Sequence, residues 1–341
     1  MILLSICIAT LNRATFIGET LDSVISQITP EVEIVVVDGA STDNTREVVN
    51  EYASRCDNLR YIQLSEKGGL DQDYCKAVKF ARGEYCWLFT DDDLLKPGAI
   101  AVVLAAARRQ YSLIVVNAEV RTTDLTVCLE ARRMHLDHDR VYPPSLPERH
   151  WLLADAGDYL SFIGGVVIKR TIWSQRELVK YYGTAFIHMG VVFQSPMPGD
   201  ALILAHPWIV IRWGNAQWVA RSFEIWMFQW PKLVWSFPDY PDWAKNQVIA
   251  CEPWRSLPRL LVNRAKGHYS VREYHEFLKP RVSSPWPRMI FYAIAIAPIA
   301  FLNWLARFRM RWILHKTLCI TFFDLQAWSD KSKQAASNVR S

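Results

Sequence analysis

Residues 88–99 read LFTDDDLLKPGA, a short apolar run that ends in three consecutive aspartates. Like-charged carboxylates repel one another, and the repulsion costs most where a strand emerges from a packed interior. The run YCWLFT at 85–90 is typical of a buried strand, and Pro97 lies at the start of a predicted helix over 97–110. The pattern therefore predicts a positive charge opposite Asp91, Asp92 and Asp93.

The first 120 residues alternate apolar runs with amphipathic stretches. Strands rich in Val and Ile that alternate with helices are typical of a mostly parallel α/β sheet. Ligands of such sheets bind beyond the carboxyl ends of the strands, so we expect Asp38 and Asp91–Asp93 to share one crevice. The predicted strands are 3–10, 33–39, 59–65, 85–90, 112–120 and, later, 161–170, and the predicted helices are 16–28, 41–53, 70–81 and 97–110.

Composition limits the class of protein. The 341 residues are 51% apolar, which is enough for a sizeable core. The seven cysteines are scattered and never spaced C-x-x-C, which argues against a disulfide framework or a zinc site and indicates a reducing compartment. The N-terminus begins a strand pattern without a basic region, so no signal peptide is expected.

The second half is rich in tryptophan and in basic residues. Seven of the 15 tryptophans fall within 208–243, and residues 251–316 carry twelve Lys and Arg against three Glu. Such a basic segment predicts an anionic surface, either a membrane or a nucleic acid. The uncharged run 289–302 is short for a spanning helix, contains Pro298 and has arginines at both ends. It predicts an interfacial or re-entrant membrane segment, with a buried core helix as the alternative.

Three adjacent carboxylates after a strand suit a divalent cation, because hard oxygen ligands are the ones that Mg²⁺ and Mn²⁺ prefer. Two or three protein oxygens leave coordination positions for phosphate oxygens. A solvated acidic turn is the alternative for any run of charges. The apolar strand before the aspartates and the presence of Asp38 at another strand end favour a metal–diphosphate site.

Four motifs, in order, resemble the signature of family 2 glycosyltransferases with the GT-A fold. They are SICIATLNR, EIVVVDGASTDNT, ARGEY at 81–85 and FTDDDLLKPGA, and they cover roughly residues 3–120. Residues 157–230, which include GDYLSFIGGVVIKR and RSFEIWMFQWP, are more narrowly similar to bacterial abequosyltransferase-type enzymes of O-antigen assembly. The resemblance implies an α/β GT-A fold with a mostly parallel sheet flanked by helices. The basic segment 251–316 and the uncharged run 289–302 add the expectation of a C-terminal membrane-associating helical region.

The resemblance also implies a division of the chain into three parts. A GT-A catalytic domain would span 1–205, with a nucleotide-sugar half to about 120 and an acceptor half over 121–205. A Trp-rich segment over 206–250 would face the acceptor or the membrane interface, and a basic, membrane-associated region would span 251–341.

Site residues follow from the family's motifs by position. Asp92 would be the direct ligand of Mn²⁺ or Mg²⁺ in the D-x-D site, with Asp91 and Asp93 helping. Asp38 would accept a hydrogen bond from the nucleotide base. The other residues expected to bind the nucleotide sugar are Thr10, Arg13, Gly39, Ser41, Asp71, Asp91, Arg212 and Arg221, the two last as phosphate contacts or, alternatively, as packing residues of the aromatic band.

The catalytic base is less well defined by the resemblance. Family members usually supply it from a Glu-Asp pair in the second half, and this sequence has no such pair there. Spacing after the VVIKR strand puts the position on His188, which can act as a base at neutral pH. A core histidine is the alternative for His188, and Asp158 and Glu224 are the carboxylate alternatives for the base.

The implied activity is metal-dependent transfer of one sugar from a nucleotide-diphosphate donor, such as CDP-abequose or a related dideoxyhexose. The implied acceptor is a polyprenyl-diphosphate-linked oligosaccharide at the cytoplasmic face of the bacterial inner membrane, where the protein would be peripheral or monotopic. No nucleic-acid partner is expected, and the oligomeric state stays open. One alternative is a nucleotidyl- or phosphotransferase, although G-x-x-x-x-G-K-[ST] is absent. Another is a membrane-recruited, non-catalytic binding protein on this fold.

Overall fold

The computed structural model describes residues 1–338 and divides the chain into two compact units. The first unit comprises Met1–Arg121, Ala131–Arg212 and Trp235–Val248. The second comprises Thr122–Glu130, Trp213–Val234 and the chain from Ile249 onward. This division differs from the predicted one, because the Trp-rich segment 206–250 is shared between the units and forms no part of its own.

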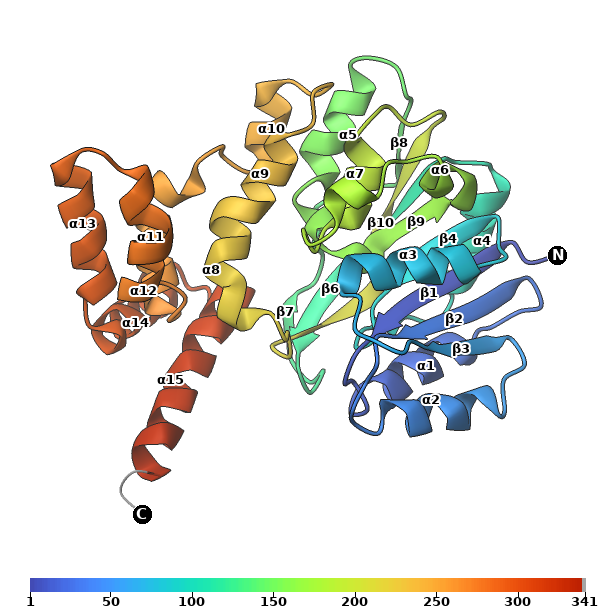
Figure 1. Ribbon diagram of the computed structural model, residues 1–341, viewed down its shortest axis with the longest axis horizontal. Helices are drawn as coiled ribbons and strands as arrows, with labels where there is room; N and C mark the ends of the chain where they lie inside the picture. The colour runs from blue at the N-terminus through green and yellow to red at the C-terminus, as the bar shows by residue number, and fades with distance from the viewer. Residues whose placement is uncertain (339–341) are drawn as a thin grey trace. The chain divides into compact units, whose positions relative to one another are not determined.

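The first unit contains a sheet with the strand order β3-β2-β1-β4-β9-β6-β10-β5 (Figure 1). Neighbours among β3, β2, β1 and β4 are parallel, whereas β9 pairs antiparallel with both β4 and β6. The predicted mostly parallel sheet of the nucleotide half is thus confirmed. The strands are β1 (Leu4–Thr10), β2 (Val32–Asp38), β3 (Leu59–Gln63), β4 (Tyr85–Phe89), β5 (Leu94–Leu95), β6 (Leu113–Thr122), β8 (Arg140–Tyr142, paired with β10), β9 (Val166–Lys169) and β10 (Ala201–Trp213).

Helices of the first unit lie against this sheet, and α3 packs on β1 and β2. The four helices predicted in the first 120 residues are present with slightly shorter bounds. The predicted strand 161–170 begins only at Val166, because residues 159–161 and 163–165 form short 3₁₀ turns. The helices are α1 (Ile17–Ile25), α2 (Thr45–Ala53), α3 (Leu70–Phe80), α4 (Ala99–Arg108), α5 (Glu148–Ala156), α6 (Arg170–Ser174), α7 (Ile187–Phe193) and α10 (Asp242–Val248).

The core of the first unit is centred on the parallel strands. Every residue of β1 and β2 is buried, as expected for Val- and Ile-rich strands covered on both faces. In β4, Trp87 is fully buried and its Nε1–H donates to the carbonyl of Gly164 at 2.8 Å. This packing fixes the carboxyl ends of β1, β2 and β4, where the site lies.

The second unit is mainly helical, with an aromatic core. The rings of Phe223 and Tyr269 stack at a centroid distance of 4.8 Å, and Trp254 and Phe291 belong to the same buried cluster. Its elements are β7 (Cys128–Glu130), α8 (Ser222–Glu224), α11 (Leu257–Ala265), α12 (Val271–Glu273), α13 (Pro285–Ile296), α14 (Ile299–Phe308) and α15 (Ile320–Asn338), and α9 (Trp230–Trp235) bridges the division of the chain.

The uncharged run 289–302 is divided between α13 and α14. Pro298 lies between the two helices, where its missing N–H and its fixed φ prevent a continuous helix. Within residues 1–338, no single helix is both long and apolar enough to cross a membrane. The pair Pro285–Ile296 and Ile299–Ile313, bent by 87°, meets that requirement only when the two helices are taken together.

Candidate active site

Three strand ends place the predicted site residues at one edge of the sheet. In the parallel register, Thr10 at the end of β1 pairs with Asp38 at the end of β2. On the other side of β1, Ile8 pairs with Phe89, so the aspartates that follow β4 begin beside the end of β1. The prediction that Asp38 and Asp91–Asp93 lie at the same edge therefore agrees with the strand register.

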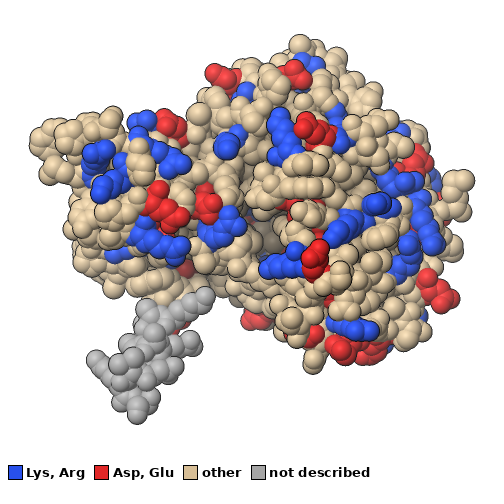
Figure 2. Space-filling model, in the orientation of Figure 1, with Lys and Arg blue, Asp and Glu red and all other residues tan. Residues whose placement is uncertain are grey.

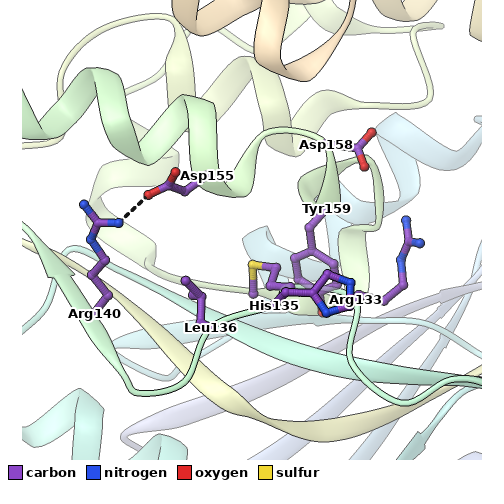
Figure 3. A pocket seen from close by; sticks show the side chains of 8 residues that line it. Arg133, His135, Leu136, Arg140, Asp155, Asp158 and Tyr159 are labelled. Carbon is purple, nitrogen blue, oxygen red and sulfur yellow. Dashed lines mark hydrogen bonds and ion pairs between the residues drawn. The ribbon is translucent and has the colours of Figure 1, made fainter.

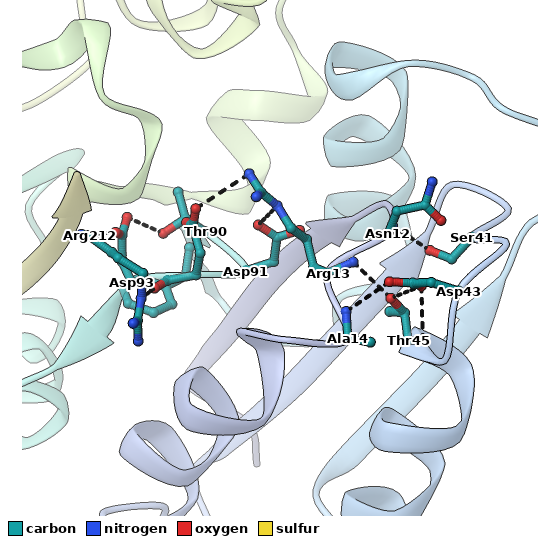
Figure 4. A network of polar contacts seen from close by, with 12 residues as sticks. Asn12, Arg13, Ala14, Ser41, Asp43, Thr45, Thr90, Asp91, Asp93 and Arg212 are labelled. Atoms are coloured by element: carbon teal, nitrogen blue, oxygen red, sulfur yellow. Dashed lines mark hydrogen bonds and ion pairs between the residues drawn. The ribbon is translucent and has the colours of Figure 1, made fainter. Parts of the chain in front are cut away.

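The positive charge opposite the aspartates is Arg13, from the loop after β1 (Figure 4). Its Nε lies 3.5 Å from Oδ1 of Asp91, and its Nη2 lies 3.4 Å from Oδ2 of Asp92. Burial raises the pKa of Asp91 to about 7, Asp92 adds to the rise, and Arg13 opposes it. Two carboxylates thus converge on one guanidinium.

Asp93 faces protein donors. Its Oδ1 accepts a hydrogen bond from the backbone N–H of Arg212 at 2.7 Å, and its Oδ2 accepts one from the hydroxyl of Thr90 at 2.5 Å. The side chain of Arg212 is buried as well. Its Nε–H donates to the carbonyl of Asp92 at 2.9 Å, and its guanidinium pairs with Glu19. Arg212 therefore braces the aspartate turn from β10, and this geometry does not support the predicted phosphate contact.

The loops after β1 and β2 are joined by side-chain hydrogen bonds (Figure 4). The N–H of Asn12 donates to Oγ of Ser41 at 2.8 Å, and the N–H of Arg13 donates to Oγ1 of Thr45 at 2.8 Å. Asn12 and Ala40 have φ of 54° and 67°, a left-handed conformation that is uncommon outside glycine. Strained backbone of this kind clusters at ligand-binding sites. Ser41, predicted beside the nucleotide, is thus part of the loop that positions Arg13.

Asp38 is fully buried at the end of β2. Its Oδ1 accepts a hydrogen bond from the N–H of Ser41 at 2.7 Å, and its Oδ2 accepts one from the hydroxyl of Tyr61 at 2.6 Å. Each oxygen already has a protein donor, so Asp38 holds the turn after β2 in shape. Its predicted hydrogen bond to the nucleotide base stays a prediction.

The predicted role of Asp71 is not supported by its contacts. Asp71 is buried in the first turn of α3, and its two oxygens accept hydrogen bonds from the N–H groups of Ala185 and Ile187 at 3.0 and 3.1 Å. Both oxygens therefore hold the start of α7. Asp73, which the sequence reasoning missed, lies about 200° further around the helix and faces Gly39 at the end of β2. The D-x-D spacing after Gly68-Gly69 was the available signal.

His188 lies in the core, so the geometry supports the alternative interpretation of this residue. It is 1% exposed, and its Nε2 lies 2.7 Å from the carbonyl of Leu160. Burial lowers the pKa of His188 to about 4. His188 lies at the start of α7, and its side chain is enclosed in the core. A general base must reach the proton that it removes, and this side chain does not reach an acceptor hydroxyl.

Of the carboxylate alternatives, Asp158 lines a pocket of about 270 Å³ (Figure 3). Arg133, His135 and Tyr159 line the same pocket, and so does Asp155, which is held by Arg140 at 2.8 Å. Asp158 is thus the candidate base that has space beside it. The pocket belongs entirely to the first unit.

Glu224 and Arg221 both belong to the second unit. Nε of Arg221 lies 3.0 Å from Oε2 of Glu224, and Gln229 donates to Oε1 of Glu224 at 2.6 Å. The hydrogen bond from Arg221 holds the pKa of Glu224 below its usual value, which weakens it as a base. The predicted roles of Arg221 at the nucleotide and of Glu224 as base stay predictions.

The aspartates after β4 are the possible ligands of a divalent cation at this edge of the sheet. No group of three or more His, Cys, Asp or Glu side chains in the described part of the chain is arranged to hold a metal ion. Asp91 and Asp92 nevertheless converge on one positive charge, and Mg²⁺ is usually held by one or two carboxylates together with substrate phosphates. Asp91 and Asp92 therefore fit such an ion, whereas both oxygens of Asp93 are used by protein donors.

Curated proteins similar to this chain are bacterial glycosyltransferases. The abequosyltransferase RfbV of Salmonella typhimurium is 27% identical over 206 residues, which are 57% of this chain and 62% of that protein. The poly(ribitol-phosphate) beta-glucosyltransferase of Bacillus spizizenii is 37% identical over 93 residues, which are 26% of this chain and 14% of that protein. The chain thus spans less than two thirds of the length of these relatives.

Solved structures share the fold at low sequence identity. S. aureus TarS 1-349 in complex with UDP-GlcNAc is 17% identical with a TM-score of 0.58, and the match covers 98% of this chain and 92% of that one. The mannosyltransferase PcManGT from Pyrobaculum calidifontis, in complex with GDP-Man and Mn²⁺, is 17% identical with a TM-score of 0.53, covering 96% and 86%.

The family comparison covers most of the first unit. Residues 5–195, more than half of the chain, match the family described as Glycosyl transferase family 2. This region includes β1, β2 and β4 and the loops that carry Arg13, Asp38 and the aspartate turn. Sequence family, shared fold and the acidic edge of the sheet agree, and we conclude that this chain belongs to glycosyltransferase family 2 and has the GT-A fold.

Proposed function

We propose that this chain transfers a single sugar from a nucleotide-diphosphate donor to a lipid-diphosphate-linked oligosaccharide. The observation that carries the proposal is the convergence of Asp91, Asp92 and Arg13 at the carboxyl edge of the parallel strands. Carboxylates can hold a divalent cation, and a guanidinium binds phosphate oxygens with paired hydrogen bonds. These are the groups that a diphosphate leaving group requires.

The roles follow from the contacts. Asp91 and Asp92 would hold Mn²⁺ or Mg²⁺. The cation would neutralise the negative charge that develops on the diphosphate leaving group. Arg13 contacts the same carboxylates, so it lies where the diphosphate would meet them. Asp93 and Arg212 hold the aspartate turn in place beneath these groups.

The proposed donor sugar is based on the sequence similarity of this chain to the relative RfbV. The relative RfbV is described as an abequosyltransferase, so we propose CDP-abequose or a related dideoxyhexose as the donor. The acceptor would be a polyprenyl-diphosphate-linked oligosaccharide of O-antigen or another surface polysaccharide. Its terminal sugar would occupy the pocket beside Asp158, whose volume of about 270 Å³ suits part of a saccharide.

Asp158 is proposed as the base that removes the proton of the acceptor hydroxyl. Asp158→Asn should reduce kcat by about a hundredfold or more, while donor affinity stays unchanged. A variant with full kcat would exclude Asp158 as base.

The activity test measures transfer and hydrolysis across CDP-, UDP-, GDP- and dTDP-sugars, with and without Mn²⁺. Asp92→Asn should abolish metal-dependent turnover while the protein still folds, because the carbonyl of Asp92 that accepts from Arg212 is unchanged. The matched control is Asp57→Asn, an exposed aspartate outside the site. Full metal-dependent activity in Asp92→Asn would overturn the metal assignment. Release of a nucleotidyl or phosphoryl group instead of sugar would favour the phosphotransferase alternative.

The second unit supports a membrane-bound location. On α14, Phe301, Trp304 and Phe308 stack in sequence and expose one apolar face, with Trp304 at 59% exposure. Exposed apolar patches of this kind mark partner or membrane surfaces. In Figure 2, the part of this unit in view carries basic and acidic side chains interspersed beside uncharged surface. The other exposed apolar residues of α13 and the following chain are Trp286, Met289, Ile290, Tyr292, Ile296, Leu305, Trp312, Ile313, Leu314 and Leu318.

We propose that this apolar face binds the cytoplasmic face of the bacterial inner membrane as a peripheral or monotopic anchor. Arg307, Arg309 and Arg311 lie on the same segment, and each basic residue near an anionic surface contributes about 1 kcal/mol. Attachment would confine the enzyme to the surface where a lipid-linked acceptor diffuses.

Flotation with phosphatidylglycerol vesicles tests the anchor. Replacing Trp286, Phe301, Trp304 and Phe308 by serine should strongly reduce flotation. The control replaces Trp151 and Trp243, two exposed tryptophans of the first unit, and should float normally. High salt should release the wild type only partly, because screening removes the electrostatic share of binding and leaves the apolar share. Unchanged flotation of the fourfold variant would overturn this anchor.

A further inference from the structure

Two tryptophans of the first unit lie side by side on its surface, outside the residues assigned above to the donor. Helices α5 and α10 pack against each other (Figure 1). The rings of Trp151 on α5 and Trp243 on α10 have centroids 4.7 Å apart and planes inclined by 56°. Trp151 is nevertheless 39% exposed and Trp243 is 41% exposed. Apolar side chains that are exposed singly are ordinary, whereas adjoining ones form a patch of the kind that binds a partner.

The ring of Trp243 is held from a second side by His150. The centroids of these two rings are 6.4 Å apart with planes at 75°, and Nε2 of His150 lies 3.1 Å from the carbonyl oxygen of Asp239. The ring of buried Tyr240 packs on His150 as well, at a centroid distance of 5.9 Å. Rings held by their neighbours lose little conformational freedom when a ligand binds, so this pair is preorganised.

Trp151 lies on the same face of α5 as two carboxylates of the pocket. Asp155 and Asp158 follow it by four and seven residues, and the backbone stays helical through Gly157 and Asp158. Residues at this spacing share one helix face. Asp155 and Asp158 line the pocket of about 270 Å³ (Figure 3), so this face leads from the pocket to Trp151. At a rise of about 1.5 Å per residue, the distance along the axis is about 10 Å.

We propose that Trp151 and Trp243 bind the sugar residues of the acceptor that lie beyond the residue in the pocket. The inference rests on the proposed function, because it takes an oligosaccharide acceptor whose terminal sugar lies beside Asp158. One face of a sugar ring carries C–H groups that pack on an aromatic ring, and its hydroxyl groups donate to carboxylates. A helix face with carboxylates at one end and an aromatic pair at the other is therefore complementary to an extended saccharide.

Exposed tryptophans also suit a membrane interface, but the charges around this pair do not. Glu148 and Asp155 lie one turn before and one turn after Trp151, on the same face of α5, and exposed Asp242 directly precedes Trp243. These carboxylates repel anionic lipid headgroups, whereas neutral sugar hydroxyls bind to them. For Trp243, which belongs to the Trp-rich segment 206–250, the charges thus favour the acceptor over the membrane.

The test compares short and long acceptors in water without lipid. The short ones are the methyl glycosides of galactose, mannose, rhamnose and glucose, and the long ones are trisaccharides that end in the same sugars. The sugar nucleotide that the protein hydrolyses serves as donor. For the wild type, kcat/KM of the trisaccharide should exceed that of its terminal monosaccharide by about tenfold, because its further residues contact the aromatic pair.

Replacing Trp151 and Trp243 together by serine should lower this ratio to near one, through a higher KM for the trisaccharide. Phenylalanine at both positions keeps the aromatic faces and should keep most of the ratio. The control Val179→Ser changes another exposed apolar side chain of the first unit and should keep the wild-type ratio.

The assignment would be overturned by a wild-type ratio near one, or by a double-serine variant that keeps the wild-type ratio. An equal loss of kcat/KM on both acceptor lengths would overturn it too, because it would show that the pair only stabilises α5. Loss of flotation in the double-serine variant would assign the pair to the membrane surface instead. In these cases transfer persists and the proposed function stands. Absence of transfer to every acceptor of either length would contradict the proposed function itself.

Discussion

Replacing Asp71 by alanine tests whether this carboxylate stabilises the fold or binds the nucleotide, as its position in the sequence predicts. Its oxygens accept hydrogen bonds from the N–H groups of Ala185 and Ile187, so they connect α3 to the start of α7. Ala185 has a φ of 64°, a conformation that costs an L-residue about 1–2 kcal/mol. Without the carboxylate, that strained turn loses the contacts that hold it.

The stability lost in Asp71→Ala follows from the burial of the N–H groups of Ala185 and Ile187. Ile187 is fully buried, so its unpaired N–H should cost about 1–3 kcal/mol. Ala185 is partly exposed, and water can satisfy its N–H at a smaller cost. Burial raises the pKa of Asp71, so removing the carboxyl recovers some desolvation energy. We expect a net loss of about 1–3 kcal/mol, and about half of that for Asp71→Asn, which keeps one acceptor.

Urea denaturation of the wild type and both variants measures this loss, with calorimetry on the folded proteins for nucleotide affinity. We expect a lower midpoint at an unchanged m-value and a dissociation constant for CDP within about twofold of the wild type. A variant with wild-type stability and much weaker CDP binding would refute the structural role and return Asp71 to the nucleotide pocket.

Three further outcomes follow from the contacts. The lowered pKa of His188, about 4 against 6.5, means that the folded protein binds fewer protons, so stability should fall by about 3 kcal/mol as pH drops from 6.5 to 4. His188→Gln should lack that loss in urea titrations and keep its kcat at pH 7, and a hundredfold lower kcat would restore the predicted base. Arg212→Met should lower the free energy of unfolding by about 2 kcal/mol, because it removes the buried hydrogen bond to the carbonyl of Asp92, whereas loss of a phosphate contact would raise donor KM with little change in stability. Ala185→Gly should raise the free energy of unfolding by up to about 1 kcal/mol, measured in urea, because glycine accepts the positive φ.

The sheet could be predicted because its signals are local. Runs rich in Val and Ile predict parallel strands buried on both faces, and this prediction needs no information from the rest of the chain. The strands β1, β2 and β4 lie within a few residues of their expected bounds. Their order in the sheet also brings Asp38 and Asp91 to one edge without knowledge of any side-chain contact. The place of the site was therefore accessible from the sequence.

The orientation of individual side chains was not accessible in the same way. Asp71 and Asp73 are two positions apart on α3, so they point about 200° apart, and only the partners packed on each face distinguish a structural carboxylate from an unsatisfied one. The burial of His188 could not be predicted either, because it depends on residues 28 positions away in the sequence, around Leu160. Residues 122–130 belong to the second unit, whose other residues all follow Arg212 in the chain, and no local feature of the sequence predicts that assignment.

The three adjacent aspartates illustrate how the fold assigns different roles to identical residues. Asp91 and Asp92 lie in a bend after β4, so the three carboxylates do not follow the alternation of an extended strand. Asp93 is held by Thr90 and by the backbone of Arg212, and it anchors the turn to β10. That anchor fixes Asp91 and Asp92, and both of these carboxylates lie within ion-pair distance of Arg13. Because Asp93 is held by protein donors, Asp91 and Asp92 are the two carboxylates that the proposed divalent cation would use together with the diphosphate.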